Sequence, residues 1–191
     1  LDDSYDVFLT QSATGALEMI ALALGLTCED EVIMPSFTYA ATANAFARTG
    51  ARIVFADIQP ETLNLDPNSV KARMTVRTKA IVPIHYGGEA ADFEQLSKLS
   101  EDTECVIIED AAHGIGAHYK GKPLGTLGLM SAYSFHHTKT IHGGGSGGAL
   151  ILNRNHAKYT EQLYESILAI YTQGTDRFAF IEGRVPAYTW Q

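Results

Sequence analysis

Lys139 is the only lysine in the segment 131–149, SAYSFHHTKTIHGGGSGGA, and most of its neighbours there are small or polar. A lysine amine that its neighbours partly remove from water has a lowered pKa and can form a Schiff base with an aldehyde. The residue types around Lys139 therefore favour a covalent anchor for an aldehyde cofactor. The alternative is a surface lysine beside a flexible loop, and the spacing alone leaves that alternative open.

Two carboxylates, Glu109 and Asp110, follow a short apolar segment earlier in the chain. The segment 105–108 is rich in β-branched residues, which is typical of a buried parallel strand. Open α/β sheets bind ligands at the carboxyl ends of such strands. A carboxylate there can pair with the protonated ring nitrogen of pyridoxal 5'-phosphate (PLP) and keep that cofactor an electron sink. The alternative is that Asp110 caps the next turn, and this segment taken alone favours that alternative.

Further motifs lie along nearly the whole chain. They are 10–14 (TQSAT), 30–39 (DEVIMPSFTY), 83–88 (PIHYGG), 109–113 (EDAAH) and 134–139 (SFHHTK). In this order they resemble the motifs of the DegT/DnrJ/StrS family of PLP-dependent sugar aminotransferases, which have the aspartate aminotransferase fold. The tail segments 174–177 (GTDR) and 188–190 (YTW) look most like the branch that aminates TDP-4-oxo-6-deoxy-D-glucose.

The resemblance implies a role for each matching side chain. Lys139 is implied as the covalent anchor and the proton-transferring base, and Asp110 as the partner of the ring nitrogen. Tyr39 and Ala112 would cover the two faces of the ring, and His113 would hydrogen-bond the phenolic oxygen. An aromatic residue such as Tyr39 is also explained by core packing.

The cofactor phosphate is expected at residues 12–14, with Ser134 as an additional hydroxyl donor. Ala13 and Thr14 lie where a strand turns into a helix, and free N–H groups at a helix start suit an anion. Ser12 or Thr14 is also explained as a simple N-cap, and the two explanations are compatible.

Two residues are candidates for substrate contact. His85 follows a predicted strand, where a satisfied structural histidine is the alternative, and Arg177, like Arg184, could meet a nucleotide phosphate. His136 and His137 flank the lysine without the spacing of metal ligands, so we predict no metal site.

Composition limits the class of protein. The chain has 191 residues, 46% of them hydrophobic, which is enough for one sizeable core. A net charge of −8 argues against nucleic-acid binding, which needs a basic surface. The two cysteines, Cys28 and Cys105, form no disulfide framework or CxxC motif, and no apolar run approaches the ~20 residues of a membrane span. We therefore expect a cytoplasmic protein.

Strand-like and helix-like segments alternate, which predicts an α/β three-layer sandwich around a mixed, mostly parallel seven-stranded sheet. The expected strands are 5–10, 31–35, 52–56, 80–85, 105–109, 130–135 and 148–153. The expected helices are 13–25, 38–49, 66–74, 93–99 and 156–171, whereas 173–191 shows no clear period. The resemblance implies that residues 1–191 are a large PLP-binding domain without the family's N-terminal segment and C-terminal small domain.

The implied activity is transfer of an amino group from an amino acid, expected to be L-glutamate, to the keto carbon of a nucleotide-linked 4-keto-6-deoxy sugar. Such a step belongs to polysaccharide or antigen biosynthesis. Lys139 argues against the family's sugar dehydratases, which have histidine at this position, and a PLP-binding but inactive fragment is a further alternative. Ser146 replaces the glutamate that most relatives have in G-E-G-G. The resemblance also implies a homodimer with shared active sites, and the apolar side chains of the tail favour it.

Overall fold

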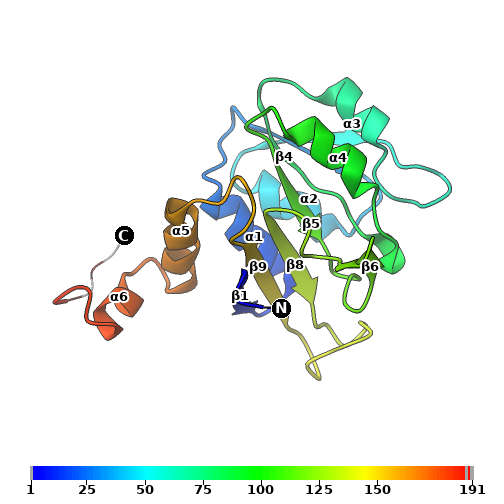
Figure 1. The fold of residues 1–191 in the computed structure, drawn as a ribbon. Helices are drawn as coiled ribbons and strands as arrows, with labels where there is room; N and C mark the ends of the chain where they lie inside the picture. The colour runs from blue at the N-terminus through cyan, green and yellow to red at the C-terminus, as the bar shows by residue number, and fades with distance from the viewer. Residues whose placement is uncertain (1, 188, 190–191) are drawn as a thin grey trace.

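The computed structural model describes residues 2–187 and residue 189. Its centre is a seven-stranded sheet in the order β1-β9-β8-β5-β4-β2-β3 (Figure 1). The strands are β1 (Tyr5–Thr10), β2 (Glu31–Pro35), β3 (Arg52–Ala56), β4 (Thr78–Ile81), β5 (Val106–Asp110), β8 (Met130–Ser134) and β9 (Gly148–Asn153). Strand β9 runs antiparallel to β1 and β8, and the other neighbours pair in parallel. The predicted α/β fold with a mixed, mostly parallel sheet is confirmed.

Helices cover both faces of the sheet. They are α1 (Ala13–Ala23), α2 (Ala40–Ala47), α3 (Pro67–Arg73), α4 (Phe93–Ser100), α5 (Glu161–Tyr171) and α6 (Arg177–Ile181). One buried cluster joins the sheet to α1, α2 and α5, and a second joins it to α3 and α4. The first five helices and the sheet therefore form three layers.

Strand β5 has no polar face because both of its sides are buried. Val106 and Ile108 belong to the cluster that contains α1, whereas Ile107 between them belongs to the cluster with α3 and α4. Side chains alternate between the faces of a strand, so a strand covered on both sides is apolar throughout. The carboxylates that end β5 consequently stand at the edge of a fully packed sheet.

Several element boundaries differ from the predicted ones. Strand β4 ends at Ile81 instead of residue 85 because Pro83 has no N–H for the ladder, although Ile84 still bridges Asp110. The last large helix begins at Glu161 instead of residue 156, since the Thr160 side chain accepts the N–H of Leu163 and caps it there.

Smaller elements were not predicted. A short hairpin joins β6 (His118–Tyr119) and β7 (Lys122–Pro123), a 3-10 turn η1 spans Tyr86–Gly88, and α6 lies within the tail. Tyr188 and Trp190, part of the motif expected in that tail, lie outside the described residues. None of the helices in the described ranges is long and apolar enough to cross a lipid bilayer.

Candidate active site

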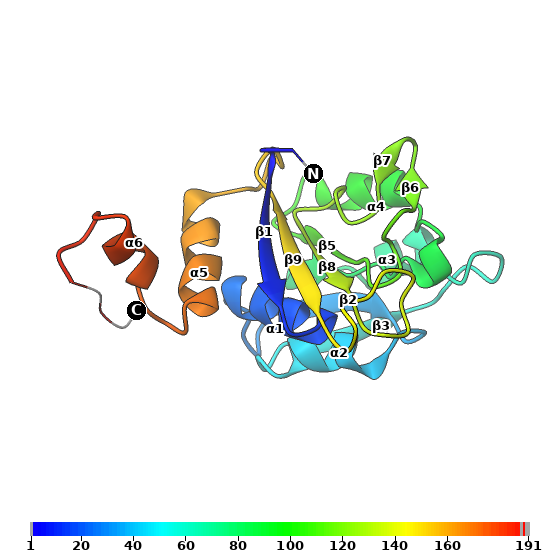
Figure 2. The ribbon, with the colours of Figure 1, turned by 90° about the horizontal axis from the view of Figure 1, so that it is seen from below.

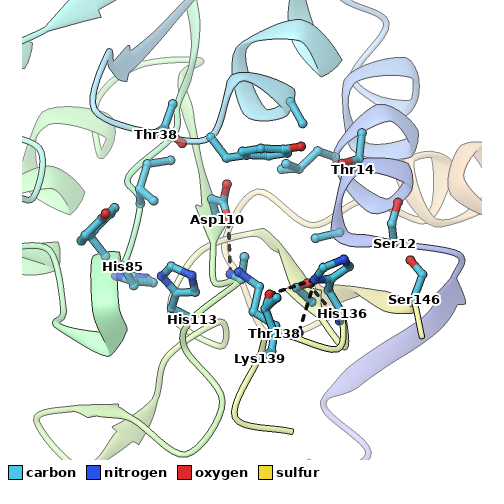
Figure 3. A pocket seen from close by; sticks show the side chains of 18 residues that line it. Ser12, Thr14, Thr38, His85, Asp110, His113, His136, Thr138, Lys139 and Ser146 are labelled. Atoms are coloured by element: carbon cyan, nitrogen blue, oxygen red, sulfur yellow. Dashed lines mark hydrogen bonds between the residues drawn. The ribbon is translucent and has the colours of Figure 1, made fainter. Parts of the chain in front are cut away.

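One cavity of about 530 Å³ opens at the carboxyl edge of the sheet. The ends of β1, β2, β4, β5 and β8 all deliver residues to it, because these strands point the same way. Its lining includes nine of the ten residues predicted for the site: Ala13, Thr14, Tyr39, His85, Asp110, Ala112, His113, Ser134 and Lys139 (Figure 3). The fold therefore brings together residues that are far apart in the sequence.

Lys139 lies in the loop after β8, half-buried in this cavity. Its backbone N–H donates to the carbonyl of His136 at 2.8 Å, which fixes the loop where the side chain leaves it. Burial lowers the pKa of the Lys139 amine, and the nearby Asp110 carboxylate partly opposes that shift. A lysine with a lowered pKa has more of the neutral amine that attacks an aldehyde.

The Asp110 carboxylate is almost fully buried and held in one orientation. Its Oδ2 accepts from the Thr42 hydroxyl at 2.7 Å, and its Oδ1 accepts from the backbone N–H of Ala112 at 3.1 Å. The Thr38 hydroxyl donates in turn to Thr42 at 3.1 Å. Thr42 was not among the predicted site residues, because its only signal in the sequence is its position one turn after Thr38 in a predicted helix.

The turn before α1 is both a helix cap and a wall of the cavity. Ser12 Oγ accepts the N–H of Gly15 at 3.1 Å, so the predicted N-cap is present. Strand β9 passes so close that a Cβ on Gly148 would lie 2.3 Å from the Ser12 carbonyl carbon.

The glycine-rich loop is attached to the same turn. The Ser146 hydroxyl donates to the carbonyl of Gln11 at 2.7 Å. Four hydroxyl-bearing residues, Ser12, Thr14, Ser134 and Ser146, line this part of the cavity.

The imidazole of His113 has a defined tautomer. Its Nδ1 accepts the backbone N–H of Gly87 at 3.2 Å, so the neutral ring carries its proton on Nε2. Gly87 has a φ of 62°, and glycine adopts this left-handed turn without a steric cost. Partial burial and the Lys139 ammonium lower the pKa of His113, which favours the neutral donor.

His85 has both ring nitrogens occupied. Its Nε2 lies 2.8 Å from Glu109 Oε2, and its Nδ1 accepts the N–H of Ala91 at 3.2 Å. The side chain is fully buried, although it touches the cavity wall. These contacts favour the structural explanation of His85 over substrate contact.

Arg177 is the one predicted site residue that does not line this cavity. It begins α6, which lies beyond α5 at the end of the molecule away from the β8–β5 region (Figures 1 and 2). Its contact with substrate stays a prediction.

Glu109 connects several segments around the site, and its only signal in the sequence is its place in a motif. Besides His85, its fully buried carboxylate accepts the N–H groups of Gly125 at 2.8 Å and of Leu127 and Gly128 at 2.7 Å. A carboxylate accepts all four bonds, because it offers only lone pairs to donors.

Glu109→Gln should lower the free energy of unfolding by about 2–4 kcal/mol, since the amide NH₂ must face donors in a buried site. Urea unfolding followed by circular dichroism measures the change. Glu104→Gln, at an exposed position before the same strand, is the matched control and should stay within about 0.5 kcal/mol of wild type. Equal stability of the two variants would contradict this account of Glu109.

The chain is similar to known proteins over most of its length. Residues 5–185 match the family model "DegT/DnrJ/EryC1/StrS aminotransferase family". The chain is 40% identical over 166 residues to UDP-2-acetamido-2-deoxy-3-oxo-D-glucuronate aminotransferase of Pseudomonas aeruginosa, covering 87% of this chain and 45% of that protein.

Two solved structures are similar in fold and sequence. NtdA from Bacillus subtilis with bound cofactor PMP has a TM-score of 0.75 and 33% identity, covering 85% of this chain and 35% of that one. DesI in the presence of its TDP-sugar product has a TM-score of 0.75 and 40% identity, covering 85% and 39%. The chain thus spans less than half the length of each of these relatives.

Proposed function

The chain belongs to the DegT/DnrJ/EryC1/StrS aminotransferase family, and we propose that the protein moves an amino group from an amino acid to the keto carbon of a nucleotide-linked sugar. The observation that carries this proposal is the half-buried Lys139 sharing one cavity with the fixed carboxylate of Asp110 and the turn at 12–14. We further propose that the described residues form the large PLP-binding domain of this enzyme.

The residues present fit PLP. Hydroxyls and helix-start N–H groups at 12–14 would hold its phosphate, and Asp110 would hold a proton on its ring nitrogen. Tyr39, 81% exposed at the cavity, and the small Ala112 would enclose the ring, while His113 Nε2–H would donate to the phenolic oxygen. When bound, PLP supplies an electron sink for the carbon that loses a proton.

Lys139 then has two tasks. Its Nζ would bind the aldehyde carbon of the cofactor and, when an amino acid displaces it, would take the α-proton of that donor. In the second half-reaction the same Nζ would return a proton to the sugar carbon that becomes aminated. Thr42 keeps the Asp110 charge aligned throughout.

The finer assignments concern substrates. We propose L-glutamate as donor and a TDP-linked 4-keto-6-deoxy sugar as acceptor, supported by the motif at 174–177 and by the similarity to DesI, whose structure was solved with a TDP-sugar product. Mass spectrometry of the product formed by the full-length protein from TDP-, UDP- and GDP-linked keto sugars tests the assignment. Turnover of another keto sugar in preference to the TDP-linked one would replace the acceptor, and no turnover with any would refute the function.

We also propose a cytoplasmic homodimer whose sites include residues from both copies. Helix α6 exposes Phe178, Phe180 and Ile181, an apolar surface that a second copy could cover. Arg177 on the same helix would then reach the cavity of the other subunit. Sedimentation of the full-length protein and of its Ile181→Asp variant tests this part, since a monomeric active enzyme would exclude shared sites.

The lowered pKa of Lys139 predicts how cofactor capture depends on pH. Only the neutral amine attacks the aldehyde, so the capture rate should rise with pH and level off above the pKa of Lys139. Because burial lowers that pKa, the midpoint should lie below the ordinary lysine value of about 10.4. Stopped-flow absorbance of apoprotein mixed with PLP measures the pH profile of capture. The ε-amine of Nα-acetyl-lysine provides the reference. A midpoint at or above the reference would contradict the prediction.

A further inference from the structure

Two aromatic rings lie together beside the cavity, on different segments of the chain. Phe37 follows β2 and Tyr86 begins η1, and their ring centroids are 4.6 Å apart. Both side chains remain partly exposed, at 39% for Phe37 and 38% for Tyr86. We call Phe37 and Tyr86 the aromatic pair.

The aromatic pair is adjacent to the residues assigned to chemistry. Tyr86 lines the same cavity as Lys139, and its ring meets that of His113 edge-on at 5.8 Å. His113 and Lys139 also share the wall of a second, smaller cavity next to the first. The Tyr86 ring therefore stands one side chain, His113, away from the reacting groups. His113 and His85, the residue before Tyr86 in the chain, lie on the side of the cavity opposite Ser12 (Figure 3).

The turn that presents Tyr86 is fixed from behind. The backbone N–H of Tyr86 donates to Asn64 Oδ1 at 3.2 Å, and Asn64 Nδ2 donates to the carbonyl of Glu89 at 3.1 Å. Asn64 is itself only 1% exposed, so these bonds are shielded from water. A ring carried by a fixed turn can act as a preformed contact surface, because the backbone loses little conformational freedom when a ligand packs on the ring.

We propose that Tyr86, backed by Phe37, packs against the C–H face of the acceptor's sugar ring and so helps to select a sugar as acceptor. This inference rests on the proposed function, because that function places the sugar carbon at Lys139. A nucleotide sugar carries its base beyond a diphosphate and a ribose, so the part of the acceptor beside Tyr86 is the sugar. The electron-rich face of an aromatic ring attracts the weakly positive C–H groups of a sugar.

Nuclear magnetic resonance tests this contact without catalysis. The probe is TDP-6-deoxy-D-glucose, which has neither the keto group nor the amine that would react, bound to the full-length PLP-loaded protein. Saturation transferred from the aromatic protons of the protein should be strongest at the sugar-ring protons, and Tyr86→Leu should weaken it there while leaving transfer to thymine unchanged. Tyr86→Phe, which keeps the ring, should retain the effect. Phe55→Leu, at a half-exposed ring on β3 outside the cavity, is the matched control.

The two half-reactions separate this contact from other roles of Tyr86. Tyr86→Leu and Phe37→Leu should each lower kcat/KM for the keto sugar by roughly threefold to tenfold, which is the loss expected from one aromatic contact. The half-reaction with L-glutamate should change by less than about twofold. An equal loss in both halves would overturn the proposal and make Tyr86 a support for His113, and a loss of thymine contact would assign the ring to the base.

The results that would refute the proposed function differ from those that would refute the sugar contact. If the wild-type protein shows no amino transfer from any donor, the function is refuted, whereas an active wild type with unaltered Tyr86→Leu refutes the sugar contact alone. If no saturation is transferred to the sugar protons of the probe even with the wild-type protein, the contact is also refuted.

Discussion

Lys139→Ala should leave a folded protein that has lost the visible absorbance of lysine-bound cofactor and at least about a thousandfold of its amino transfer. Among the described residues that line the cavity, Lys139 is the one that carries an amine. Its side chain is half-buried in a loop, so its removal should change stability by less than about 1 kcal/mol. Absorbance spectra, single-turnover kinetics with L-glutamate and thermal unfolding measure the three effects.

The controls for Lys139 distinguish a covalent anchor from a general loss of charge. Lys120→Ala removes an exposed lysine that pairs with Glu94 outside the cavity, and it should retain both absorbance and activity. Borohydride reduction followed by peptide mass spectrometry should place the cofactor on Lys139 in the wild type. Partial rescue of Lys139→Ala by a small added amine would support the assignment, and full activity without rescue would refute it.

The central sheet could be predicted because its strands carry a strong local signal. Segments such as 31–35 and 105–109 are short and apolar, and burial on both faces requires that pattern. The site could be predicted because the parallel strands end at one edge, which turns a sequence list of strand ends into neighbours in space. The motifs then assigned chemistry to those ends.

The rest of the site depends on contacts that no local pattern encodes. Thr42 reaches Asp110 across 68 positions of sequence, and Glu109 binds N–H groups that become available only when the loop 124–128 folds around it. The sequence placed Glu109 at a strand end, yet alternation sends its carboxylate to the face opposite that of Asp110. Helix α6 was missed because five residues are too few for a periodic signal.

Asp110→Asn should slow the half-reaction with L-glutamate by on the order of a hundredfold or more, by analogy with other fixed charges that stabilise a transition state. The variant should still fold and bind PLP. An asparagine oxygen can accept from the Ala112 N–H, and its amide can donate to Thr42, whose hydroxyl has lone pairs to accept it. The variant therefore loses the negative charge that we propose faces the ring nitrogen.

Asp110→Asn should not slow the capture of PLP, although it slows the half-reaction with L-glutamate. This difference separates cofactor binding from the chemical step. The Asp110 carboxylate raises the pKa of Lys139, so removing its charge should lower that pKa further and increase the neutral amine at a given pH. Capture of PLP by the Asp110→Asn apoprotein at neutral pH should therefore be no slower than in wild type, while the glutamate half-reaction is much slower. Thr42→Val, which keeps the charge and removes the bond that orients it, should show a smaller loss of half-reaction rate. Wild-type half-reaction rates in Asp110→Asn would exclude a role for this charge, and slowed capture in both variants would instead show that the carboxylate serves to shape the cavity.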